Sequence, residues 1–268
     1  MHFVEPHVYL IAKSALQPDE AQRWLDDLGA QDFRLPEGTE AEQLATLAGK
    51  RCYMSFQPGL NPNVTRVRQD VAAFIGNILE SRHGSVLEHV SYTFAIENVS
   101  RVFTAEMNRH RAGWAVSEGS LRYIRFTDIP VWMPFSMRDK EGDPETVREA
   151  KRRSRDIFER AFRQMEENYR ELESIWQLDQ MKAFEQKKKI TSAMRRIIGM
   201  GVATGGVWTG NLRALRHVLA LRIDASAEEE IAYVFTLILK KMLEQEPNFF
   251  ADFHQTEDGF WKPEHWKI

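Results

Sequence analysis

The sequence predicts an α+β protein that is mostly helical, with a small antiparallel or mixed sheet. Most of its 268 residues fall in segments where apolar side chains recur every three or four positions, which is the period of amphipathic helices. Residues 89–98 (HVSYTFAIEN) instead alternate apolar and polar side chains, which is typical of a half-buried strand. Hydrophobic residues make up 43% of the chain and no linker divides it, so we expect a single domain over residues 1–268.

The elements expected before this strand are short. Residues 6–14 (PHVYLIAKS) predict a first strand, residues 19–29 predict a helix that ends at Gly29, and a second helix begins near Glu40, followed by an extended piece. Residues 59–63 (GLNPN) predict a turn. The next helix has Gly84 as its candidate stop, and its buried stripe consists of Val67, Val71, Phe74, Ile75, Ile78 and Leu79.

The rest of the chain is expected to be helical. A helix from Val99 carries residues 109–111 to its C-terminal end, where the helix dipole favours cations. A long helix has Asp143 as its N-cap and Pro144 at its first position. Further helices cover residues 189–201 and 211–222, and a last helix has the apolar residues Ile231, Val234, Phe235, Ile238 and Met242.

Residues 199–211 (GMGVATGGVWTGN) are rich in glycine. They lack the third glycine of a dinucleotide-binding loop, because Thr204 stands in its place, and no strand is expected before them. We therefore expect these glycines to permit close packing of helices.

Composition excludes several classes of protein. The net charge of −3 argues against a nucleic-acid-binding surface, and no apolar run reaches membrane-spanning length. Cys52 is the only cysteine, so neither a disulfide within the chain nor a cysteine-rich metal site is expected, and we expect no metal. The N-terminal residues do not resemble a signal peptide. We therefore expect a cytoplasmic protein without a membrane or nucleic-acid partner.

Three clusters of titratable residues indicate anionic ligands. Residues 109–123 (RHRAGWAVSEGSLRY) combine three arginines with a histidine and a glutamate, and the planar guanidinium group suits phosphate. His110 is expected to be neutral, because cations flank it. Residues 82–89 (RHGSVLEH) form either a polar turn or a nucleotide-contacting loop. On residues 211–222, the side chains of Arg213, Arg216 and His217 are expected to share the polar face, where their repulsion requires an anion, either from a ligand or from a partner chain or carboxylate-rich neighbour.

These segments resemble those of the flavin-dependent thymidylate synthases. The family signature, Arg-His-Arg followed by a spacer and Glu-x-Ser-x-Arg-Tyr, is similar to RHRAGWAVSEGSLRY. Two further family segments are similar to RHGSVLEHVSYTF and WTGNLRALRHVLALRIDASAEEEI, in the same order. The resemblance covers about residues 50–243 and leaves residues 1–45 and 246–268 as extensions that no family motif covers.

The resemblance implies an α/β fold with a helical part, assembled as a homotetramer with active sites at subunit interfaces. It also implies FAD as the cofactor, NADPH and methylenetetrahydrofolate as co-substrates, and transfer of a one-carbon unit to C5 of a uracil nucleotide, dUMP. Such a flavin mechanism needs no thiolate. This agrees with the single Cys52, which has no obvious activating base nearby in the sequence.

Roles of single residues follow from the same resemblance. The flavin-contacting positions are matched by His83, Ser85, Arg109, His110, Arg111, Glu118, Asn211, Arg213 and His217. The nucleotide-contacting positions are matched by Glu106, Ser120, Arg122, Arg195 and Arg222. The resemblance implies that Arg195 holds the phosphate and that Arg222 stabilises negative charge on the pyrimidine ring. Ser120, the other candidate catalytic residue, is expected to bind substrate rather than attack it, because no general base is evident beside it.

The sequence departs from the family pattern at Ser117, Glu106, His217 and Ser226, where asparagine, glutamine, asparagine and histidine are common. A carboxylate at Glu106 would repel a phosphate but accept a hydrogen bond from a ribose hydroxyl. Alkylation of another pyrimidine nucleotide, such as UMP, is therefore an alternative function. A more remote alternative is a non-catalytic oligomer that binds nucleotides or RNA and has no use for a flavin.

Overall fold

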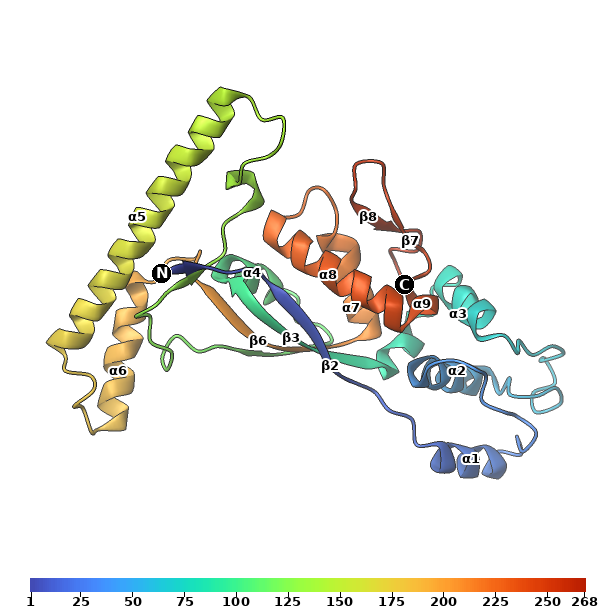
Figure 1. The fold of residues 1–268 in the computed structure, drawn as a ribbon. Helices are drawn as coiled ribbons and strands as arrows, with labels where there is room; N and C mark the ends of the chain where they lie inside the picture. Colours follow the sequence, from blue (N-terminus) through green and yellow to red (C-terminus); the bar gives the residue numbers. More distant parts are fainter. The chain divides into compact units, whose positions relative to one another are not determined.

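The computed structural model describes residues 1–268, and the chain forms two compact units (Figure 1). Unit 1 consists of Met1–Val8, Ala95–Arg109 and Val116–Val207. Unit 2 consists of Tyr9–Phe94, His110–Ala115 and Trp208–Ile268. The predicted α+β class, mostly helical with small sheets, is confirmed. The assignment of residues 1–268 to a single domain stays a prediction.

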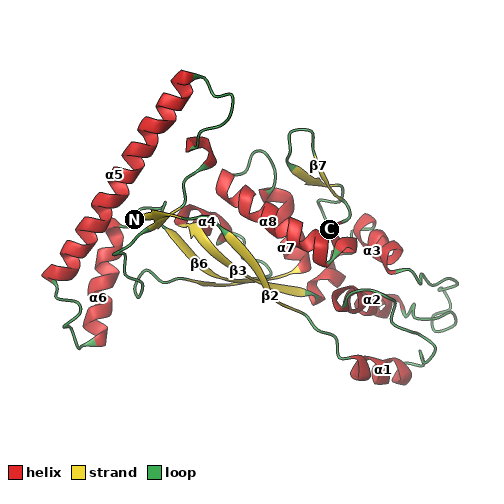
Figure 2. Ribbon diagram, viewed as in Figure 1, coloured by secondary structure: helices red, strands yellow, loops and turns green.

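Four strands form the largest sheet, in the order β2-β3-β6-β4 (Figure 2). They are β2 (His7–Lys13), β3 (Ser91–Ser100), β6 (Ala203–Asn211) and β4 (Trp114–Glu118). The sequence predicts β2 and β3, and along the first half of β3 every second residue is buried, as the alternation of apolar side chains requires. It does not predict β4 or β6.

The glycines of β6 lie in a strand, so the expectation that they serve helix packing is wrong. They make room for side chains of the neighbouring strands. In unit 1, Gly205 lies against the carboxylate of Glu97 on β3, and in unit 2, Gly210 lies against the indole of Trp114 on β4. A Cβ atom at Gly210 would lie 2.8 Å from two ring carbons, which is closer than van der Waals contact allows. At these two glycines the large side chains therefore come from the partner strands, while β6 itself contributes the fully buried Trp208.

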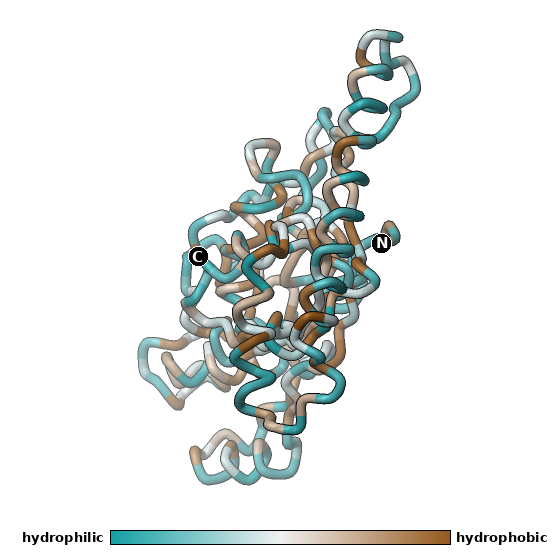
Figure 3. Tube along the Cα trace, turned by 90° about the vertical axis from the view of Figure 1, so that its left-hand side faces the viewer, coloured by the Kyte–Doolittle hydropathy of each residue, from teal (hydrophilic) through white to brown (hydrophobic).

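Unit 1 is built around the long helix α5 (Glu145–Ile175), along which hydrophobic and hydrophilic residues alternate (Figure 3). Its other elements are α4 (Arg101–Met107), η2 (Phe135–Met137), α6 (Phe184–Met194), η3 (Arg195–Ile197) and the parallel pair β1 (His2–Phe3) and β5 (Pro130–Val131). The apolar core of this unit consists of Phe126, Ile129, Val131, Met165, Tyr169, Leu178, Met194 and Val202.

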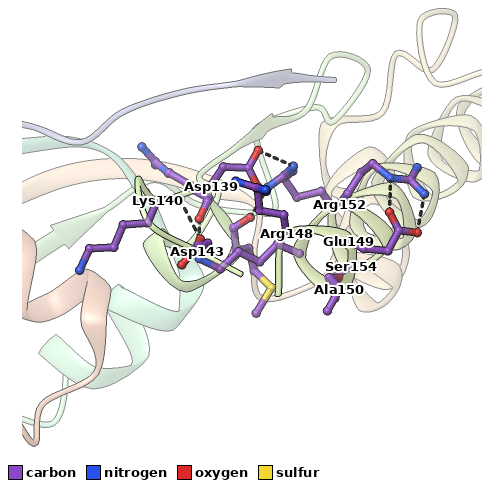
Figure 4. A network of polar contacts seen from close by, with 12 residues as sticks. Asp139, Lys140, Asp143, Arg148, Glu149, Ala150, Arg152 and Ser154 are labelled. Carbon is purple, nitrogen blue, oxygen red and sulfur yellow. Dashed lines mark hydrogen bonds and ion pairs between the residues drawn. The ribbon is translucent and has the colours of Figure 1, made fainter. Parts of the chain in front are cut away.

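The start of α5 lies one residue later than predicted. Pro144 is the N-cap residue, and Asp143 accepts a hydrogen bond from the Lys140 amide at 2.9 Å instead of capping the helix (Figure 4). Asp143 also pairs with the Lys151 ammonium at 2.6 Å, and this bond is the main reason why the pKa of its carboxyl is lowered. None of the helices has the length and apolar character needed to cross a membrane.

Unit 2 holds most of the short elements. Its helices are α1 (Pro18–Asp27), α2 (Glu40–Tyr53), α3 (Val71–Glu80), η1 (Gly84–His89), α7 (Leu212–Arg222), α8 (Glu229–Gln245) and α9 (Pro247–Phe250). α7 packs against η1 and α8, and α2 packs against η1 and α3. Near the C-terminus, β7 (Phe253–Gln255) and β8 (Trp261–Pro263) form an antiparallel hairpin. An apolar cluster between α1 and α2 consists of Leu16, Leu25, Ala30, Phe33, Leu47 and Phe56.

The start of α2 is confirmed, and its end is not. Thr39 and Glu42 form a reciprocal capping box, which explains why the helix begins at Glu40. The extended piece expected after this helix is wrong, because the helix continues to Tyr53. The turn over residues 59–63 is confirmed, and the Asn61 side chain stabilises it by accepting a hydrogen bond from the amide of residue 63 at 3.0 Å.

The start and the end of α3 each have a local cause that the hydrophobic pattern does not reveal. The Asp70 carboxylate accepts a hydrogen bond from the Ala73 amide at 2.6 Å, so the helix begins after Asp70 and excludes Val67. Beyond its other end, Arg82 has a positive φ of 59°. Gly84, the candidate stop, instead opens η1.

Candidate functional site

The predicted helix before the Arg-His-Arg segment is confirmed, but it begins at Arg101 rather than Val99 and ends at Met107, so residues 109–111 follow the helix instead of forming its last turn. Within unit 2, Nε2 of His110 accepts a hydrogen bond from Nε of Arg222 at 2.9 Å. The arginine nitrogen can only donate, so this bond requires a neutral imidazole whose Nε2 carries no proton. Arg109 and Arg111 are exposed, and Glu106 on α4 is half-buried.

In unit 1, Glu118 at the end of β4 is held on both carboxylate oxygens. One oxygen pairs with the guanidinium of Arg101, which also donates to the Gly119 carbonyl at 2.7 Å. The other oxygen accepts a hydrogen bond from Nδ2 of Asn108 at 2.9 Å. The Arg101 side chain is 12% exposed and its Nε has no partner. Sequence reasoning missed Arg101, although a cation in the first turn of a helix opposes the helix dipole and so indicates a carboxylate nearby.

Arg195, the first residue of η3, adds a second positive charge near Arg101. Burial lowers the pKa of Arg101 from its ordinary value, and the charge of Arg195 lowers it further. Glu118 pairs with Arg101 alone, so the group keeps a net positive charge. An anionic ligand would balance that charge, and this is the electrostatic setting that the expected phosphate contact of Arg195 needs.

Ser120 and Arg122 form a turn after β4. Oγ of Ser120 accepts a hydrogen bond from the Arg122 amide at 3.4 Å and makes no hydrogen bond to a basic side chain. The Arg122 guanidinium lies 5.6 Å from the ring centroid of Tyr123. Arg122 also lines a small cavity of about 130 Å³ together with Lys187 and Lys188. Ser120 therefore has the surroundings of a binding residue rather than an activated nucleophile.

A larger cavity in unit 1, of about 670 Å³, lies beside Glu118. Its polar lining includes Glu97, Ser117 and Thr204, and Gly205 forms part of its wall. The Thr204 hydroxyl is buried without a hydrogen-bond partner. A buried hydroxyl in this condition commonly bonds to water or to a ligand.

In unit 2, Asn211 caps the N-terminus of α7. Its Oδ1 accepts a hydrogen bond from the Ala214 amide at 2.8 Å, and its backbone amide donates to the Gly113 carbonyl at 3.1 Å. Gly113 has φ 76°, and a Cβ atom there would lie 2.7 Å from Nδ2 of Asn211. Asn211, which is expected to contact flavin, therefore also holds the backbone of Gly113 in place, between His110 and β4.

The three basic residues of α7 do not share one exposed face. The expectation that they do is wrong for Arg216, which is buried. Arg216 makes a bidentate ion pair with Asp252, at 2.9 and 2.8 Å. Arg213 pairs with Glu88 at 2.6 Å, and His217 is exposed. Two carboxylates of the same unit thus relieve the repulsion between the arginines, and no ligand is needed for that purpose.

Arg213 and His217 nevertheless line a cavity of about 580 Å³. Arg82 and Lys267 line it as well, and neither cation pairs with a carboxylate. The backbone oxygen of Ile268 accepts a hydrogen bond from Nε of Arg213 at 2.9 Å. The excess positive charge fits the pyrophosphate of a flavin dinucleotide.

His83 and Ser85 line a different cavity of unit 2, of about 470 Å³. The His83 ring stacks on the Tyr53 ring with 6.0 Å between their centroids. Gly84, between the two residues, lies against the backbone of Ile268, which also lines the 580 Å³ cavity. Four of the flavin-contacting positions predicted for unit 2 thus border two neighbouring cavities, whereas His110, Arg111 and Asn211 line neither of them.

The chain matches a protein-family model described as "Thymidylate synthase complementing protein" over residues 34–248. Among curated proteins, it is 29% identical to the flavin-dependent thymidylate synthase of Corynebacterium aurimucosum over 252 residues, which cover 94% of this chain and 92% of that protein. It is 31% identical to the flavin-dependent thymidylate synthase of Mycobacterium tuberculosis over 213 residues, which cover 80% of each.

Two solved structures share the fold, both of a UMP/dUMP methylase, PolB, from Streptomyces cacaoi. The structure bound with 5-Br UMP gives a TM-score of 0.62 at 19% identity and covers 93% of this chain and 94% of its own. The structure bound with 5-Br dUMP gives a TM-score of 0.58 at 20% identity, with coverages of 94% and 96%.

Proposed function

The chain belongs to the family of thymidylate synthase complementing proteins, and on that premise we propose that it transfers a one-carbon unit to C5 of a uracil nucleotide with FAD as cofactor. The curated relatives named above are flavin-dependent thymidylate synthases, which supports dUMP as substrate and dTMP as product. The observation that carries the proposal is the pair of neighbouring guanidiniums of Arg101 and Arg195, of which only the first is paired with Glu118.

The roles proposed for the nucleotide fall to residues of the signature, of η3 and of α7. Arg195 holds the phosphate, while Ser120 and Arg122 bind the rest of the nucleotide. Arg222 stabilises the negative charge that develops on the pyrimidine ring, and its hydrogen bond to His110 orients the guanidinium. The proposed reaction uses no thiolate, and the exposed Cys52 donates a hydrogen bond from its thiol to the Ala48 carbonyl at 3.5 Å.

The flavin is held mainly by cations and by the residues around η1. Arg213 and His217 bind its phosphates, with Arg109, Arg111 and Asn211 as further contacts. His83 and Ser85 border the neighbouring cavity, where they bind another part of the same molecule. Bound FAD, once reduced by the proposed nicotinamide co-substrate, would supply the hydride that completes the methyl group and would return to its oxidised form. The fit of FAD rests on the unpaired cations of the 580 Å³ cavity.

We further propose NADPH as electron donor, methylenetetrahydrofolate as one-carbon donor and a homotetramer as the active assembly, located in the cytoplasm. The relative from Corynebacterium aurimucosum is a flavin-dependent thymidylate synthase, and thymidylate synthesis is the reaction for which these co-substrates are proposed. Exposed apolar side chains on α5 support association between chains, since Ile157 is 56% and Ile175 is 65% exposed.

UMP is the second candidate substrate. PolB, whose two structures share this fold, is a UMP/dUMP methylase and was solved with 5-Br UMP and with 5-Br dUMP. The carboxylate of Glu106, which stands where the family commonly has glutamine, favours a substrate with an additional ribose hydroxyl.

The test is the visible absorption spectrum of the protein supplied with FAD and titrated first with dUMP and then with UMP. A flavin band that shifts with dUMP supports thymidylate synthesis. A shift with UMP alone would support the same reaction with UMP, rather than dUMP, as the substrate. A protein that binds no flavin would contradict the proposal and favour a non-catalytic nucleotide-binding oligomer.

A further inference from the structure

We propose that the segment after β8, residues 264–268, binds the adenosine end of FAD and makes this chain discriminate FAD from FMN. The inference rests on the proposed flavin-dependent function. It concerns residues outside the family match, which ends at residue 248, and assigns them a part in the cofactor site.

The segment is anchored in unit 2 by the buried ion pair of Arg216 and Asp252. The backbone amide of His265 donates to Oδ2 of Asp252 at 3.1 Å, and its carbonyl accepts from Nη2 of Arg216 at 3.3 Å. The Glu264 amide donates to the Asp252 carbonyl at 2.9 Å. The Arg216 and Asp252 side chains are 2% and 7% exposed, so the anchor is shielded from water.

This anchor places Trp266 and Lys267 on the wall of the cavity that Arg213 and His217 also line. The Lys267 ammonium lies 4.7 Å from the centroid of the Trp266 ring. Trp266 is 58% exposed, which is unusual for an indole and leaves most of its aromatic surface available to a ligand. An aromatic ring beside cations is the combination that binds a nucleobase by stacking and its phosphates by charge.

The chemistry of this wall matches the part of FAD that FMN lacks. FAD carries an adenine and a second phosphate, whereas FMN ends at one phosphate. Trp266 offers a stacking surface for the adenine, and Lys267 and Arg82 are cations without a carboxylate partner for the pyrophosphate. The Ile268 carbonyl bonded to Nε of Arg213 holds the end of the segment against the same cavity.

The experiment measures the dissociation constants of FAD and FMN by quenching of flavin fluorescence, for the full chain and four variants. Trp266→Ala is expected to weaken FAD binding about tenfold or more and to leave FMN binding unchanged. Trp266→Phe keeps a stacking ring and should retain most of the FAD affinity. Lys267→Ala should weaken FAD binding more than FMN binding and reduce its dependence on salt.

The control is Lys262→Ala, which removes an exposed cation of β8, just before the segment, that does not line the cavity. It should leave the FAD-to-FMN ratio unchanged. If the unaltered chain binds FAD and neither Trp266→Ala nor Lys267→Ala changes that ratio, the inference is wrong and the proposed function stands. If the unaltered chain binds no flavin, both are wrong.

Discussion

Nε of Arg222 donates a 2.9 Å hydrogen bond to Nε2 of His110, and this bond joins the end of α7 to the Arg-His-Arg segment. The two residues lie 112 positions apart in the sequence. Since the bond fixes both the tautomer of the imidazole and the direction of the guanidinium, the two side chains act as one unit. A substitution at either position therefore changes the orientation of the other.

Substitution of Arg222 tests its part in the reaction. Arg222→Lys keeps the positive charge but loses the planar group that bonds to His110, and kcat is expected to fall about 100-fold or more. The melting temperature should change little. Arg163→Ala, which removes an exposed arginine of α5, is the control. A kcat within threefold of the unaltered enzyme would contradict the assigned role.

Substrate choice is tested at Glu106. If its carboxylate binds a ribose hydroxyl, UMP should bind more tightly than dUMP, and Glu106→Gln should narrow that difference. Isothermal titration of the FAD-loaded protein with each nucleotide measures both constants. Equal affinities of UMP and dUMP for the unaltered protein would remove this role from Glu106.

Loss of the Arg101 side chain should destabilise the protein. Arg101→Ala leaves Glu118, whose side chain is 19% exposed, with Asn108 as its remaining side-chain partner, and the free energy of unfolding should fall by about 2–4 kcal/mol. Denaturation by urea measures the difference. Arg163→Ala breaks an exposed pair at 3.7 Å and should cost less than about 1 kcal/mol. Equal effects of the two substitutions would show that the Arg101 pair has no special importance.

Substitution of three glycines by alanine should change stability in an order set by how closely other side chains pack against each glycine. Gly210→Ala brings a Cβ atom against the Trp114 indole and should cost about 1–3 kcal/mol. Gly205→Ala meets only the carboxylate of Glu97, an exposed and flexible side chain, and should cost less. Gly76 lies on α3 with open space around it, so Gly76→Ala should raise stability by about 0.5–1 kcal/mol. A reversal of this order in thermal unfolding would contradict the described packing.

Stability should rise above pH 8 because of Lys50. Its ammonium is buried beside the rings of Phe33 and Phe74, and burial, together with the charge of Arg68, lowers its pKa from 10.5 to about 8. Between these two values the unfolded chain binds the proton and the folded chain does not, so the contribution of Lys50 to the free energy of unfolding increases with pH.

The measurement compares urea denaturation of the unaltered protein and of Lys50→Met at pH 7.5 and at pH 9.5. The unaltered protein should gain stability relative to the variant over this interval. Parallel changes in the two proteins would show that Lys50 titrates at its ordinary pKa when folded.

The fold was predictable where one segment carries its own pattern. β3 alternates buried side chains, and α2 begins with the capping pair Thr39 and Glu42, so both follow from local sequence. β6 was not predictable in this way, because Gly205 and Gly210 leave space that Glu97 and Trp114 of other strands fill. Burial alternates along the second half of β6, but Trp208 is the one large apolar side chain on its buried face, so the hydrophobic pattern does not reveal the strand.

The candidate site was predictable as a set of residue types and less so as a set of contacts. The expectation of a neutral His110 agrees with its hydrogen bond to Arg222. The partners of Arg101 and Arg216 were not predictable, because Glu118 and Asp252 lie 17 and 36 residues away and only the folded chain brings them together. The individual binding roles stay predictions.

The buried pair of Arg216 and Asp252 also determines how often the end of the chain opens. Terminal segments usually fray, and their amide hydrogens then exchange with water within seconds. Here the Asp252 carboxylate accepts the amide of His265, so this hydrogen exchanges only when the segment leaves the ion pair, while the Asp252 carbonyl accepts the amide of Glu264. The His265 amide therefore shares the exchange protection of the interior of unit 2, although it lies near the end of the chain.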